Sequence, residues 1–195
     1  SAYLELKIDL AKCYYSSLNF EKARGIVEKL LKFNLPQKSE KIVVKMAVEI
    51  YIKKMSFREA EENLEIYKEI AERGYPNIFS LIYRNEKYTM KEYYELAAKL
   101  NKGRDRFSQA ISFVDKAIFE TSTSDYRSLG KLYKLRGNIL KNACQNRTLL
   151  YPVRLNIETF DDKIEEILFM NSTDILQECI STYTQSYLYY RRVAD

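Results

Sequence analysis

The segment at positions 57–67 reads FREAEENLEIY, and this stretch decides the fold. Its residues Phe57, Ala60, Leu64 and Tyr67 are three or four positions apart, which places them on one face of an α-helix. Charged and polar residues fill most of the positions between them. The small side chain of Ala60 would allow a second helix to approach closely. The segment therefore predicts an amphipathic helix that packs against a neighbour.

Other segments repeat this fingerprint of an aromatic, a small, a bulky and a small or apolar residue. The copies are Phe20-Ala23-Val27-Leu30, Phe107-Ala110-Val114-Ala117 and the degenerate Leu176-Cys179-Tyr183-Ser186. Apolar stripes at helical spacing precede each copy, and Asn19 and Thr89 are the expected caps of two of the helices. The pattern predicts nine or ten helices. It predicts no strand, except that 147–160 fits either a loop or a short strand.

The helices that precede the copies have their own pattern. Leu10, Ala11 and Tyr14 follow a Leu-small-x-x-Tyr order, and Tyr133 and Gly137 follow an aromatic-x-x-x-Gly order. Together with the fingerprint, this pattern resembles the tetratricopeptide repeat family, whose period is about 34 residues. The resemblance implies an all-α fold, a right-handed solenoid of antiparallel helix pairs. An ordinary helical bundle with accidental spacing is the alternative.

The resemblance also implies a domain organisation. We expect residues 1–195 to form a single repeat domain, with repeats near 2–35, 39–73, 88–121 and 124–192. The uneven spacing of the copies predicts an extra turn or short helix near 75–88 and an insertion near 145–172. A helical pattern that starts at Ala2 leaves open that the chain is a piece of a longer protein.

Composition argues against an enzyme. Apolar residues make up 46% of the chain and charged residues 30%, which is typical of a chain that folds. The sequence has no histidine, which excludes imidazole acid–base catalysis, His-activated nucleophiles and imidazole metal ligands. It has no glycine-rich phosphate loop either. We therefore expect no catalytic residue, no metal and no cofactor.

The cysteines and the hydropathy pattern bear on location. Cys13, Cys144 and Cys179 are far apart and odd in number, which predicts buried free thiols in a reducing compartment. The longest uncharged run, 179–190, is shorter than the roughly 20 residues of a membrane span. We expect a cytoplasmic protein, with a nuclear location as the alternative, and no membrane partner.

Solvent-facing positions of the first helices are the candidate binding site. In the family that the chain resembles, the first helix of each pair lines a concave groove that binds ligands. The corresponding residues are Ile8, Lys12, Tyr15, Lys45, Glu49, Ile52, Glu95, Lys99, Lys102, Lys134, Asn138 and Lys141. The set is mildly basic, as is the whole chain at +5. We therefore expect the partner to be another protein, through a peptide or helix with some acidic character.

Two other functions stay open at this point. The chain could be a structural slice of a larger α-solenoid in a multidomain scaffold or kinase, with contacts through its ends. Its C-terminal helix would then pack on a further repeat or on a second copy of the chain. Helical-repeat RNA binding is the weaker alternative, based on Tyr187, Tyr189 and Tyr190 before Arg191 and Arg192.

Overall fold

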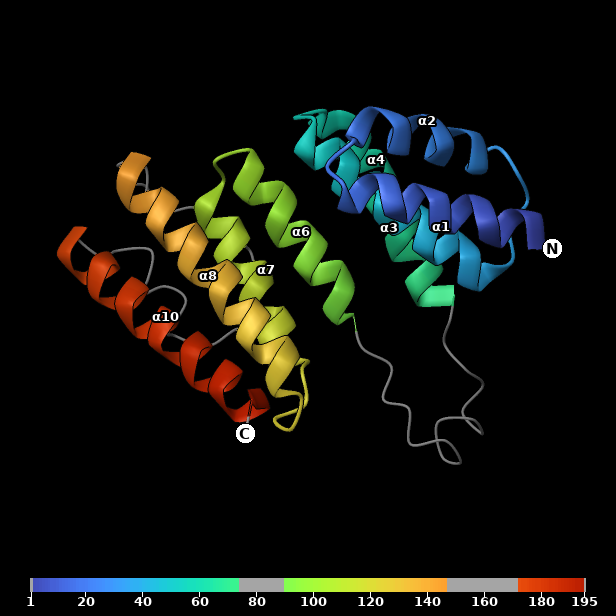
Figure 1. The fold of residues 1–195 in the computed structure, drawn as a ribbon. Coiled ribbons are helices and arrows are strands. Elements are labelled where there is room, and N and C mark those ends of the chain that lie inside the picture. Colours follow the sequence, from blue (N-terminus) through green and yellow to red (C-terminus); the bar gives the residue numbers. More distant parts are fainter. Residues whose placement is uncertain (1, 74–89, 147–171, 195) are drawn as a thin grey trace. The chain divides into compact units, whose positions relative to one another are not determined.

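The computed structural model describes residues 2–73, 90–146 and 172–194 (Figure 1). These ranges contain eight α-helices and no strand, which confirms the all-α prediction. The helices are α1 (Ala2–Ser16), α2 (Phe20–Leu30), α3 (Gln37–Lys53), α4 (Phe57–Arg73), α6 (Lys91–Gly103), α7 (Phe107–Phe119), α8 (Tyr126–Asn146) and α10 (Ser172–Ala194). The expected extra helix near 75–88, the insertion near 145–172 and the ambiguous 147–160 lie wholly or almost wholly outside the described residues.

The chain divides into two compact units, 1–88 and 89–195. In the first unit α1 packs on α2, α3 packs on α4, and α3 also contacts both α1 and α2. In the second unit α6 packs on α7 and α8 packs on α10, while α8 also contacts α6 and α7. Figure 1 shows that consecutive helices within each unit run in opposite directions. The single repeat domain expected from the sequence stays a prediction.

The same three-residue turn closes three of the helix hairpins. The central residue of each turn has a positive φ of 57–61°, and these residues are Leu18, Met55 and Asp105. In each turn the next residue donates its backbone N–H to the carbonyl five positions earlier, at 2.8–2.9 Å. This is the hydrogen bond of a Schellman helix end. Each second helix then begins with a phenylalanine, at Phe20, Phe57 and Phe107.

Two expected helix caps have different outcomes. The Asn19 side chain accepts a hydrogen bond from the N–H of Lys22 at 3.3 Å, so the predicted cap is confirmed. The predicted capping box begins at Thr89, which lies outside the described residues. The N-cap residue of α6 is Met90, whose N–H donates to the carboxylate of Glu120 at 2.9 Å. A carboxylate from the end of α7 thus accepts a hydrogen bond from the start of α6.

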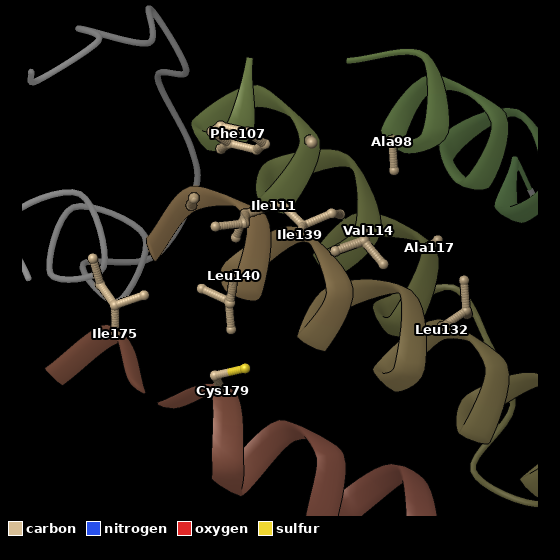
Figure 2. Packing of buried hydrophobic residues seen from close by; sticks show 12 residues of the cluster. Ala98, Phe107, Ile111, Val114, Ala117, Leu132, Ile139, Leu140, Ile175 and Cys179 are labelled. Carbon is tan, nitrogen blue, oxygen red and sulfur yellow. The ribbon is translucent and has the colours of Figure 1, made fainter. Parts of the chain in front are cut away.

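The small residues of the fingerprint lie in the core. Ala23, Ala60 and Ala110 are each 0% exposed, as expected for positions where helices approach closely. Figure 2 shows how α7 and α8 bring their apolar side chains together in the second unit, with Ile175 and Cys179 of α10 beside them. The fourth copy is only partly correct, because Leu176 is 51% exposed. It lies to one side of the face that α10 buries.

Helices α8 and α10 meet along a seam of glycine and tyrosine. A Cβ atom at Gly137 would lie 3.0 Å from the ring of Tyr183, and one at Gly130 would lie 3.4 Å from the ring of Tyr190. The two glycines are seven residues apart, and so are the two tyrosines, so the pairs match along antiparallel helices. The glycines therefore make room for aromatic rings that lie flat against α8.

Candidate functional site

In the first unit, the predicted positions lie on two helices that touch each other. Lys12 is exposed and its Nζ is 2.9 Å from Oδ1 of Asp9, one turn away on α1. Tyr15 is half-buried, with its ring centroid 5.6 Å from that of Phe20. Lys45, Glu49 and Ile52 are half-buried on α3. These five residues are thus accessible in part and come from adjacent first helices.

Ile8 is the exception in that unit. Only 4% of this residue is exposed, and Ala11, three residues later on the same face, is fully buried. The expectation that Ile8 faces solvent is therefore wrong. The apolar side chain turns towards the core because α1 packs against both α2 and α3.

In the second unit, the predicted positions lie on α6 and α8. Glu95, Lys99 and Lys102 are half-buried, and Nζ of Lys99 is 2.7 Å from Oε1 of Glu95. Lys134 and Lys141 are exposed on α8. Intrahelical ion pairs therefore neutralise part of the predicted basic set, and the most accessible positive charge of this unit's set lies on α8.

Asn138 has a packing role. Its Oδ1 accepts a hydrogen bond from the hydroxyl of Tyr183 at 2.7 Å, which ties α8 to α10. A side chain in this bond has less freedom to contact a partner. We define the groove row as the ten predicted positions that remain after Ile8 and Asn138 are set aside. Whether these residues bind a partner stays a prediction.

Arg136 is the centre of a buried polar cluster that the sequence patterns did not reveal. Its Nε is 2.8 Å from Asp115 of α7, and its Nη1 is 2.5 Å from Glu178 and 2.9 Å from Thr182 of α10. The partners are 21 to 46 residues away in sequence, so no local motif marks them. The cluster joins α7, α8 and α10.

The charges of this cluster perturb one another. Burial raises the pKa of Asp115, and the positive charge of Arg136 only partly opposes this effect. Burial alone would lower the pKa of Arg136, but the carboxylates of Asp115 and Glu178 raise it above its usual value. Every buried side-chain nitrogen or oxygen in the described ranges has a hydrogen-bond partner. The cluster is therefore satisfied internally, which indicates a structural role.

The aromatic–basic end of α10 also packs within the unit. The ring of Tyr189 stacks on those of Tyr126 and Tyr133, with centroids 6.2 and 5.5 Å away. The guanidinium carbon of Arg192 lies 5.5 Å from the Tyr126 centroid. Of the tyrosines considered for RNA stacking, Tyr187 is the most exposed, at 64%. These contacts favour a packing role over base stacking.

The described ranges also bear on other classes of site. They hold no cluster of three or more Cys, Asp or Glu side chains able to bind a metal ion. None of their helices is long and apolar enough to cross a membrane. The three cysteines are free thiols, but Cys13 is exposed and Cys144 half-buried, so burial was predicted correctly only for Cys179. Comparisons with protein-family models, curated proteins and solved structures found no match for this chain.

Proposed function

We propose that this chain is a protein-interaction scaffold of tetratricopeptide-like helix pairs. In this proposal the pairs form a right-handed solenoid, and its first helices bind a peptide or helix of a partner protein. The observation that supports it most is the contact between first helices, α1 with α3 and α6 with α8, within each unit. This contact places the groove row on neighbouring helices, so that one ligand could span two of them.

The repeated hairpin turn supports the same proposal. Three hairpins share their turn length, their left-handed central residue and their first phenylalanine. Such agreement is expected of stacked structural repeats, which commonly present extended binding surfaces. The exposed Lys12, Lys134 and Lys141 would attract acidic residues of the ligand as point charges.

Capture of partners from cell lysate tests this proposal. The full chain is compared with a Lys12→Glu, Lys134→Glu, Lys141→Glu variant and with a control of equal charge change. The control replaces the exposed Lys38, Lys53 and Lys131, which lie outside the groove row. A protein that the control retains and the first variant loses would support the proposal. Equal capture by all three would overturn the assignment of the groove row.

A structural role in a larger α-solenoid is the second candidate. It is favoured by apolar side chains that α10 leaves exposed, namely Leu176 at 51%, Ile180 at 66% and Tyr187 at 64%. Their spacing puts them on one side of the helix, where a further repeat could cover them. In the same lysate capture, an Ile180→Glu, Tyr187→Glu variant should then lose the protein that supplies the further repeat. The groove-row variant should still capture that protein.

A further inference from the structure

The first unit contains a pocket that does not use the groove row. It lies where the beginning of α1 meets the end of α2, helices that run antiparallel in Figure 1. Its volume is about 370 Å³. Its apolar lining consists of Tyr3, Leu4, Ile26, Leu30 and Phe33. This volume is at the low end of the range of roughly 300–1,000 Å³ for ligand pockets. It is therefore suited to one or two large side chains.

Two aromatic rings of this pocket are unusually accessible. Tyr3 is 64% exposed and Phe33 is 60% exposed, whereas Leu30 beside them is 3% exposed. The N–H of Phe33 donates to the carbonyl of Leu30 at 3.0 Å, so the backbone holds Phe33 near the end of α2. Exposed aromatic residues beside a buried apolar floor resemble the anchor sites of protein interfaces, where rigid rings lose little entropy on binding.

The rest of the lining is entirely basic. Lys7, Lys29 and Lys32 complete it, and it contains no acidic residue. Nζ of Lys7 lies 5.5 Å from the Tyr3 centroid, which places a positive charge directly at the aromatic lip. Lysine stems also extend apolar surface while their ammonium groups stay hydrated. An apolar ligand with negative charge at its edges would therefore match both the floor and the rim.

Glu5 of α1 is exposed and lies outside the pocket lining, and two other nearby acidic residues have partners of their own. Asp9 of α1 pairs with Lys12. Glu28 of α2 accepts a hydrogen bond from the hydroxyl of Tyr51 at 3.2 Å and pairs with Arg24. Neither is part of the pocket lining. The three lining lysines thus produce a local positive potential, which reaches about 8 Å at physiological ionic strength.

We infer that this pocket binds an acidic segment of a partner protein, with large apolar side chains inserted between α1 and α2. The acidic residues of that segment would lie against Lys7, Lys29 and Lys32. This inference goes beyond the proposed function, because no residue of the pocket belongs to the groove row. Either surface could bind without the other.

Direct binding of designed peptides to the full chain tests the inference. The probe is a fluorescein-labelled peptide with Leu and Phe at helical spacing among Glu residues. One control peptide has Lys in place of Glu, and the other has Ala in place of Leu and Phe. Fluorescence polarisation should show binding of the first peptide alone, and binding should weaken as salt increases.

Three protein variants locate the binding. Phe33→Ala removes an exposed ring, and Lys29→Glu with Lys32→Glu reverses the rim. Each should weaken binding about tenfold or more. Lys38→Glu with Lys131→Glu makes the same charge change elsewhere and should leave affinity within about twofold. Circular dichroism of each variant checks that its helix content is retained, so that lost binding is not lost folding.

Several outcomes would overturn the inference. These are no binding of the acidic peptide, or equal binding by the Phe33→Ala variant and wild type. A third is that no peptide binds but Phe33→Ala changes the self-association of the chain in sedimentation, which would indicate a second copy as occupant. A fourth is that the chain binds phosphatidylserine vesicles but not the peptide. Lysate capture that still depends on the groove row would show that the proposed function survives such a failure.

Discussion

The residues that adopt the left-handed backbone conformation in the three hairpin turns are not glycines. In this conformation a Cβ atom crowds the following carbonyl, at a cost of roughly 1–2 kcal/mol that glycine avoids. Met55 has a φ of 58° and is 72% exposed, so its side chain has little packing to lose. The three turns therefore keep local strain that a glycine would remove.

Replacement of Met55 by glycine should stabilise the first unit. We expect the free energy of unfolding to rise by about 0.5–1 kcal/mol, because relief of the left-handed strain exceeds the extra entropy of the unfolded glycine. Urea unfolding followed by circular dichroism measures the change. Met55→Ala keeps the Cβ atom and should give no gain. A gain of equal size in both variants would show that backbone strain is not the cause.

Glycines of different helices should respond in opposite ways to alanine. Gly25 of α2 has no atom within 4 Å of an added Cβ, so Gly25→Ala should stabilise by about 1 kcal/mol through helix propensity. At Gly137 the added Cβ would meet the Tyr183 ring at 3.0 Å, and that ring is held by its bond to Asn138. We expect Gly137→Ala to destabilise by about 1–3 kcal/mol. Stabilisation by both substitutions in thermal unfolding would mean that Tyr183 moves aside freely.

At the scale of elements, one guanidinium joins three helices. Arg136 is 7% exposed and faces two carboxylates, so the cluster has one positive and two negative charges. We expect Arg136→Met to lower the free energy of unfolding by about 2–3 kcal/mol, since it leaves both carboxylates without their cation. Asp115→Asn leaves the pair of Arg136 and Glu178, and should cost less than about 1 kcal/mol. Urea unfolding of both variants measures this asymmetry, and equal losses would contradict it.

The raised pKa of Asp115 also predicts a pH dependence. A carboxyl whose pKa is higher in the folded state binds more protons there, so its contribution to stability is largest below the unfolded pKa. That contribution is lost as pH rises through the folded pKa. Asn cannot titrate, so the free energy of unfolding of Asp115→Asn, relative to that of wild type, should be higher at pH 7 than at pH 4. Urea unfolding at both values tests this sign, and a constant difference would show that the pKa is not shifted.

Elements could be predicted where the determinants were local. The spacing around Ala23, Ala60 and Ala110 predicted both the helices and their buried side, because helical periodicity acts over a few residues. The Arg136 cluster and the Met90–Glu120 cap depend on residues brought together by packing. The same is true of Ile8, which the family resemblance placed in the groove and which the packing of α1 on α2 and α3 buries. The pocket was missed because its lining combines residues of α1 with residues in and just after α2, which are distant in sequence.

At the scale of the whole molecule, the second unit has a core of its own. The buried cluster in Figure 2 consists of side chains from α6, α7, α8 and α10. Polar contacts also connect helices of this unit. Lys91 at the start of α6 pairs with Asp125, just before α8, at 3.2 Å. The Asp125 side chain in turn caps α8 through the N–H of Ser128 at 3.1 Å. The described helices of the second unit thus supply its apolar core and the side-chain caps at the starts of α6 and α8.

A protein of residues 89–195 alone should therefore fold. We expect a helical circular dichroism spectrum and a cooperative unfolding transition, which an Ile139→Asp substitution in the core should abolish. In a repeat array, stability is the sum of intrinsic terms and terms for contacts between neighbours. The stability of α6–α10 in the full chain, minus that of the isolated piece, therefore measures any coupling to residues 1–88. A near-zero difference in the free energy of unfolding would indicate two independent units. A difference of several kcal/mol would indicate one cooperative solenoid. A piece that binds hydrophobic dyes and melts without a transition would contradict the prediction of a self-sufficient core.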